Sequence, residues 1–253
     1  MQKEIEKALD AFKKQNFDEA IELFEEGLKK DPQNPHIINN IGLCYAKLAQ
    51  DEKAEEYFLE ALKLDNKQVE TYVNLADMYF KQRRIEEDMN LLETAVTLMP
   101  DNIVLKHYLA RIYIEDVRFD MAIDQLSEIL DLSPKNIDAY WDLGNIYFEQ
   151  GEYDNAISNY EQLLELVDSN AIILYQTALA YESNDNIDKA ISYYLKSLSI
   201  NPEFHPAYKK LGMLFMARGD KDDALEYFND YINFDLPEDE KSNIKEIISR
   251  IDK

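Results

Sequence analysis

A small residue, alanine or glycine, returns every 34 residues along the chain. It occupies the eighth place of seven successive blocks, at Ala8, Gly42, Ala76, Ala110, Gly144, Ala178 and Gly212. A second alanine follows twelve places later in six of the seven blocks, and Asp88 takes its place in the third. A repeat of this length indicates a unit that stacks on copies of itself and shares its core with its neighbours.

The residues around these small positions fall into two helical stripes. Positions 4, 7, 8 and 11 of each block have the i, i+3, i+4, i+7 spacing of one helix face, and positions 20, 24 and 27 have the same spacing for a second helix. Only 6 Gly and 7 Pro interrupt the 253 residues, which favours long helices joined by short turns. The sequence therefore predicts an all-α chain of antiparallel helix pairs.

The positions that recur most strictly resemble those of the tetratricopeptide repeat (TPR) family. Block five carries Tyr140, Leu143, Gly144, Tyr147, Ala156 and Tyr160 at the family's offsets, and Pro32, Pro100, Pro134 and Pro202 close four blocks. The resemblance implies a right-handed superhelical solenoid of antiparallel helix pairs. We expect seven repeats, at 1–34, 35–68, 69–102, 103–136, 137–170, 171–204 and 205–238, followed by a C-terminal capping helix at 239–253.

The sequence at both ends of the repeat array is typical of capping units. Glu4 and Lys7 stand at positions that are usually apolar, which suits a polar outer face at the N-terminal end. After Pro237, an isoleucine stripe that includes Ile244 and Ile251 departs from the repeat pattern and predicts the capping helix. Inside the array, a carboxylate at Asp88 is costly to bury, so we expect the third helix pair to open or shift there.

Charge and cysteine content narrow the function classes. The chain holds 51 acidic and 27 basic residues, a net charge of −24, which disfavours nucleic acid and anionic membranes as partners. No run of about 18 apolar residues predicts membrane insertion, and the charged first ten residues do not resemble a signal peptide. The single cysteine, Cys44, fits a reducing, cytoplasmic location and is interpreted as a packed thiol.

Motifs for catalysis are missing from the sequence. It contains no glycine-rich phosphate loop, no nucleophile elbow and no zinc-protease histidine pair. The three histidines, His36, His107 and His205, lie in different blocks. We therefore expect no enzyme activity, no cofactor and no metal site, and we look for the function on a surface.

In TPR proteins the first helix of each repeat lines a concave groove, so by resemblance positions 2, 5, 6, 9, 12 and 13 face that groove. These positions hold eight acids and six bases, and the acidic excess lies mostly outside them. Lys13, Lys47 and Lys81 form a basic row at position 13 that would favour an acidic ligand. The candidate peptide-binding residues are amides that could hold a peptide backbone, aromatic anchors and one arginine: Asn40, Asn74, Tyr108, Arg111, Trp141, Asn145 and Tyr175.

Three functions fit these features. The first is a non-catalytic scaffold or adaptor that takes a peptide segment of a protein partner into the groove. The second is a regulatory sensor that responds to a peptide. The third is a structural subunit that forms a homo-oligomer through its ends or its acidic convex face. For Arg111, a partner carboxylate and the neighbouring acids Asp77 and Asp142 are the competing ion-pair partners, and we expect one of these two acids to hold it.

Overall fold

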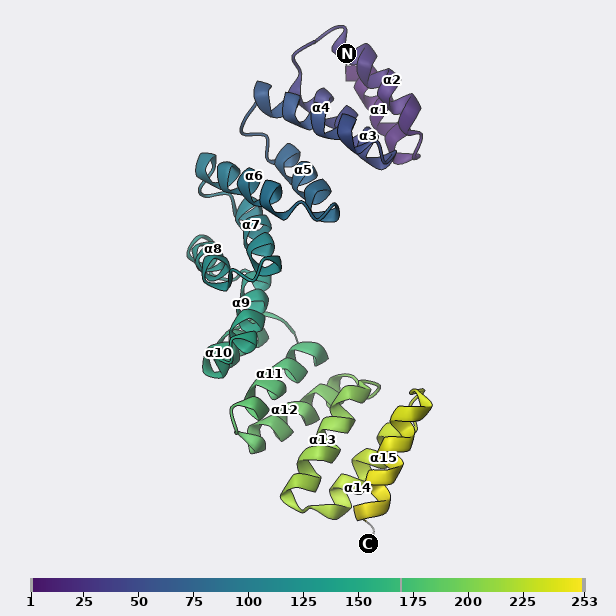
Figure 1. The fold of residues 1–253 in the computed structure, drawn as a ribbon, viewed down its shortest axis with the longest axis vertical. Helices are drawn as coiled ribbons and strands as arrows, with labels where there is room; N and C mark the ends of the chain where they lie inside the picture. Colours follow the sequence, from purple (N-terminus) through teal and green to yellow (C-terminus); the bar gives the residue numbers. More distant parts are fainter. Residues whose placement is uncertain (1, 169, 252–253) are drawn as a thin grey trace. The chain divides into compact units, whose positions relative to one another are not determined.

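The computed structural model describes residues 2–168 and 170–251 of the chain (Figure 1). Within these ranges the backbone forms fifteen α-helices and no β-strand, which confirms the all-α prediction. Fourteen helices alternate as the first and second members of successive antiparallel pairs, and one further helix follows them. The chain divides into two compact units, residues 1–134 and residues 135–253.

The first unit contains four helix pairs: α1 (Gln2–Lys13) with α2 (Phe17–Leu28), α3 (Pro35–Lys47) with α4 (Asp51–Leu64), α5 (Val69–Lys81) with α6 (Ile85–Leu98), and α7 (Ile103–Glu115) with α8 (Phe119–Leu132). The second unit contains three pairs and the final helix: α9 (Ile137–Glu149) with α10 (Tyr153–Leu166), α11 (Ala171–Ser183) with α12 (Ile187–Ile200), α13 (His205–Arg218) with α14 (Lys221–Ile232), and α15 (Glu238–Ile251).

The small residue at position 8 allows the two helices of a pair to approach around an aromatic ring. A Cβ atom added to Gly144 would lie 2.5 Å from the Tyr160 ring, and one added to Gly212 would lie 2.7 Å from the Phe228 ring. Both rings are fully buried. The glycines are therefore required by the close contact with the ring, and the second alanine of the pattern is buried in the same seam.

Asparagine side chains begin several of the first helices. Asn34, Asn102, Asn136 and Asn170 each precede a first helix and accept hydrogen bonds from backbone N–H groups of its first turn. These N–H groups have no partner inside the helix, so each cap stabilises the point at which a new repeat starts.

Tyrosines at position 11 join one repeat to the preceding one. The hydroxyl of Tyr113 donates to Glu93 at 2.8 Å, and that of Tyr181 donates to Glu161 at 2.6 Å. Leu195 occupies the place of these glutamates in the sixth repeat. The seventh repeat has Phe215 at position 11, and phenylalanine has no hydroxyl that needs a hydrogen-bond acceptor. These bonds connect a first helix to the second helix of the repeat before it.

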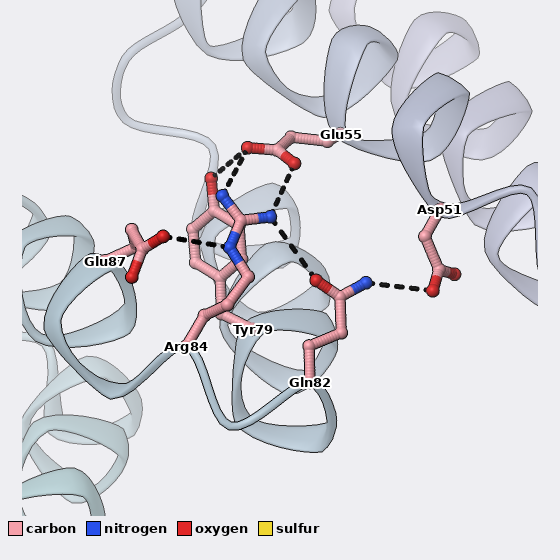
Figure 2. A network of polar contacts seen from close by, with 6 residues as sticks. All are labelled: Asp51, Glu55, Tyr79, Gln82, Arg84 and Glu87. Carbon is pink, nitrogen blue, oxygen red and sulfur yellow. Dashed lines mark hydrogen bonds and ion pairs between the residues drawn. The ribbon is translucent and has the colours of Figure 1, made fainter.

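Arg84 builds the most extensive of these connections, as Figure 2 shows. Its guanidinium forms a bidentate pair with Glu55 at 2.7 and 3.0 Å, donates from Nε to Glu87 at 3.0 Å and stacks over the ring of Tyr79. Tyr79 also donates its hydroxyl to Glu55 at 2.7 Å. The guanidinium holds the pKa of the Glu55 carboxyl below its ordinary value, and the bidentate geometry links the second and third repeats.

Helix α15 lies against α14. Ile244 and Ile251 are buried in one cluster with Phe228 and Tyr231, and the carboxylate of Glu240 accepts hydrogen bonds from Tyr231 and Lys209 at 2.7 Å. The isoleucine stripe therefore packs against the second helix of the last pair. At the other end Glu4 pairs with Lys30 at 3.0 Å.

The turn inside every pair uses one left-handed residue at position 15. The residues with positive φ are Gln15, Ala49, Arg83, Val117, Gly151, Asp185 and Gly219. Only two of them are glycines, and Val117, with φ of 58°, is the one β-branched residue in this set. A β-branched side chain is strained in this region, so Val117 marks a turn that the sequence does not favour.

We expect Val117→Gly to raise the free energy of unfolding by about 0.5–1 kcal/mol. The left-handed conformation costs a non-glycine residue about 1–2 kcal/mol, and the greater freedom of glycine in the unfolded chain offsets part of this gain. The Val117 side chain is 68% exposed, so its removal sacrifices little packing. Urea unfolding measures the change, with Gly151→Val as the matched control that should lose stability. A Val117→Gly protein no more stable than the original would refute the strain.

Candidate peptide-binding surface

In the first unit, Arg111 on α7 occupies a slot between two aromatic rings. Its guanidinium lies 4.7 Å from the ring centre of Phe80 and 4.3 Å from that of Tyr108. Its Nη2 donates to Asp77 at 3.2 Å, and the Tyr108 hydroxyl donates weakly to the same carboxylate at 3.4 Å. The ion pair with Asp77 is one of the two partnerships expected from the sequence. Both of its side chains are 42% exposed, so the cluster reaches the surface.

Behind this cluster lies the buried carboxyl of Asp88 on α6. Among the residues that the structure describes, neither of its oxygens has a hydrogen-bond partner, and the nearby Nε of Arg111 is also buried without one. Burial raises the pKa of the Asp88 carboxyl to about 7, the Arg111 charge opposes this shift, and Asp77 adds to it. Helices α5 and α6 pack less closely than any other pair within a repeat, as the sequence led us to expect, although the carboxyl itself remains fully buried.

The two asparagines predicted in this unit differ in their surroundings. Asn74 on α5 donates from Nδ2 to Oδ1 of Asn39 at 3.0 Å, which links neighbouring first helices. Asn40 on α3 is half-buried and makes no such bond among the described residues. Asn74 also lines a pocket of about 190 Å³ between α3 and α5, together with Asp77.

In the second unit, Trp141 and Tyr175 both rest on the same buried core. The Trp141 ring centre lies 6.0 Å from that of Tyr160, and the Tyr175 ring lies 5.2 Å from Phe204 and 5.4 Å from Tyr194. Both side chains are half-buried, so each presents part of its ring and uses the rest for packing. Asn145 accepts a hydrogen bond from the Tyr160 hydroxyl at 2.8 Å, which occupies its carbonyl oxygen.

The predicted residues thus lie on α3, α5 and α7 of the first unit, where Tyr108 and Arg111 are in contact, and on α9 and α11 of the second. Sequence reasoning missed Phe80 as the second ring under Arg111, although it stands at groove position 12. It also missed Lys106, a lysine at packing position 4 that is only 3% exposed and pairs with Glu128. For Lys106, the signal was a charged residue at position 4, which is apolar or aromatic in every other block after the first.

Three other kinds of site can be checked in the part of the chain that the structure describes: a reactive thiol, a metal site and a membrane-spanning helix. Cys44 is buried and free, and desolvation raises the pKa of its thiol to about 12, which confirms the packed thiol. No group of three or more histidine, cysteine or acidic side chains among residues 2–168 and 170–251 is arranged to hold a metal ion. Over the same residues, no helix combines the length and the apolar character needed to traverse a bilayer.

Comparison with known families decides the class of the protein. Tetratricopeptide repeat models match residues 5–69, 69–99, 171–204 and 207–234, and a TPR repeat model matches residues 110–151 and 144–185. The chain belongs to the tetratricopeptide repeat family. The TPR fold generally serves as a non-catalytic scaffold for protein interactions. A search of curated proteins found no match to this chain.

Solved TPR structures share the architecture. The C-terminal part of a TPR repeat-containing protein from Cytophaga hutchinsonii is 20% identical, with 91% of this chain and 95% of that chain covered and a TM-score of 0.77. A Parabacteroides merdae TPR protein is 19% identical, with 100% and 98% covered and a TM-score of 0.63. YrrB, described as a TPR protein with an unusual peptide-binding site, is 20% identical, with 73% and 95% covered and a TM-score of 0.61.

Asp88→Ala should stabilise this TPR protein in a pH-dependent way. The folded-state pKa of about 7 exceeds the ordinary value of 3.8, so the folded state binds the proton more tightly than the unfolded state. The stability lost to Asp88 therefore grows as pH rises from about 4 to about 7 and stays constant above. We expect the variant to gain about 1–3 kcal/mol at pH 8 and less at pH 5.

Chemical unfolding of both proteins at pH 5 and pH 8 measures this difference. The isosteric Asp88→Asn variant serves as a control because it keeps the polar group and removes the titration. Its stability relative to the original protein should also increase with pH. A gain from Asp88→Ala that is the same at both pH values would contradict the raised pKa.

Proposed function

We propose that this protein is a cytoplasmic, non-catalytic scaffold that binds a peptide segment of a protein partner along the groove-facing sides of its first helices. The observation that carries the proposal is the pair of half-buried aromatic residues in the second unit. Trp141 and Tyr175 are large rings seated on a firm core and still accessible at one side. Rings held in this way are typical anchors of protein interfaces.

The polar residues of the same helix faces complement these anchors. Asn40 is half-buried with no hydrogen-bond partner in the described residues, so both its amide groups are available to a peptide backbone. Asn145 keeps its Nδ2 group as a donor because Tyr160 uses only its oxygen. In the second unit, a peptide held by the Asn145 amide and two aromatic anchors would be recognised partly by shape and partly by its apolar side chains.

The likeness to YrrB supports the same class of ligand, since that TPR protein is described by its peptide-binding site. A self-associating subunit is the less favoured alternative, because Ile244 and Ile251 are already buried against α14. A peptide-responsive sensor uses the same groove and differs in its response. It would change its radius in solution when the ligand binds, which small-angle scattering would detect.

The test compares partner capture from the native host's lysate by the intact protein and by the Trp141→Ala/Tyr175→Ala variant. We expect the specific partner to be lost or weakened at least about tenfold, because truncating a central aromatic anchor costs about 2 kcal/mol or more. Circular dichroism and the unfolding midpoint show whether the variant is folded.

Leu195→Ala provides the matched control, since Leu195 is an exposed apolar residue on the second helix α12. It should capture the partner as well as the intact protein. Equal capture by the Trp141→Ala/Tyr175→Ala variant, or loss with Leu195→Ala alone, would move the binding surface away from the first helices.

A further inference from the structure

The pocket between α3 and α5 coincides with the predicted groove positions. Its lining contains six of them and three further residues: Leu43, Ala46, Lys47, Asn74, Asp77 and Lys81, then Asp51, Met78 and Gln82. Its volume of about 190 Å³ is smaller than the ~300–1,000 Å³ typical of small-molecule sites. A pocket of this size suits one side chain of a larger ligand.

The two acids of the lining are already engaged by the protein itself. Asp77 accepts hydrogen bonds from Arg111 and Tyr108. Asp51 accepts one from Nε2 of Gln82 at 2.8 Å, and Figure 2 shows that the oxygen of the same Gln82 amide faces Arg84. The charge of Asp77 is therefore compensated by Arg111. Asp51 keeps its charge, because the Gln82 amide that donates to it is neutral, so the two lysines of the lining face one uncompensated acid.

The two lysines of the lining are not engaged. Lys47 and Lys81 are exposed, and neither forms an ion pair or a hydrogen bond with any residue that the structure describes. In a chain with a net charge of −24, two unpaired lysines at one pocket are a local exception. Their charges make this part of the groove complementary to an anion.

The remaining lining restricts which anion fits. Leu43, Ala46 and Met78 supply apolar surface, and the Met78 side chain is only 6% exposed. Methylene groups gain free energy on such a surface, whereas an inorganic anion has none to bury. A glutamate side chain combines a carboxylate with two methylenes and is short enough for the pocket.

We propose that this pocket binds a glutamate side chain of the peptide partner, with the carboxylate between Lys47 and Lys81 and the methylenes against Leu43 and Met78. The proposal rests on the proposed function, because the glutamate belongs to the peptide that the groove receives. It adds a chemical preference: an acidic residue is selected in the first unit, and apolar residues are selected at Trp141 and Tyr175 in the second.

Methyl NMR on protein carrying ¹³C-methyl methionine tests the pocket directly. The probes are N-acetyl-glutamate N-methylamide and its neutral analogue N-acetyl-glutamine N-methylamide, and Met78→Leu identifies the Met78 signal. We expect the glutamate probe to shift the Met78 methyl signal and the glutamine probe to shift it far less. Lys47→Ala/Lys81→Ala should weaken binding of the glutamate probe by about tenfold, or about 1.4 kcal/mol.

Two controls keep the result specific. Lys13→Ala removes an exposed lysine of the same row that does not line the pocket, and it should leave the response unchanged. Lys47→Arg/Lys81→Arg retains the charge and should retain binding. The proposal is overturned if Met78 responds equally to both probes, if it responds to neither, or if Lys13→Ala has the same effect as the pocket variant.

The outcome is separable from that of the proposed function. The NMR titration measures a pocket on α3 and α5, whereas partner capture is tested through Trp141 and Tyr175 on α9 and α11. Partner capture that depends on the aromatic residues, without a glutamate response at Met78, would refute only the pocket. A glutamate response without aromatic-dependent capture would refute the proposed mode of peptide binding and leave an isolated carboxylate site.

Discussion

The close approach of two helices at a small residue is the constraint on which the structure depends. Gly144 and Gly212 leave room for the buried rings of Tyr160 and Phe228, which an added Cβ atom would meet at 2.5 and 2.7 Å. The approach sets the geometry of each pair, and each pair leaves apolar surface that the next pair covers. A substitution that separates the two helices of one pair would therefore also disturb its packing against the repeats on both sides.

Polar contacts then set how one repeat meets the next. Tyr113 and Tyr181 reach back to glutamates of the preceding second helix, and Arg84 and Tyr79 do the same with Glu55 between the second and third repeats. These bonds need both partners in register, because a buried hydroxyl without an acceptor loses free energy. Apolar packing supplies most of the cohesion between repeats, and the tyrosine and arginine bonds specify the register.

The third repeat departs from this scheme at the position of the second alanine. Asp88 places a carboxyl inside the seam, and Arg111 lies nearby between two rings while it pairs with Asp77. The same Asp77 lines the pocket together with Lys47, for which no described residue provides an ion-pair partner. The buried carboxyl of Asp88 lowers the free energy of unfolding. It lies in a region that also holds an ion pair and an open pocket, and such a combination is typical of functional surfaces.

The sequence by itself determined the repeat, the helical class and the small-residue seam, because position 8 recurs in every block and its period requires stacked helix pairs. It also supplied Asp77 and Asp142 as the two candidate acids for Arg111, because all three stand at groove positions of neighbouring repeats, and the structure shows the pair with Asp77. Only the tertiary structure decided which side chains remain available. Tyr160 takes the oxygen of Asn145 and packs on Trp141, whereas no residue that the structure describes pairs with Lys47. Such pairings depend on contacts between helices that a periodic pattern does not encode, since spacing sets the face of a side chain and neighbouring helices set its partner.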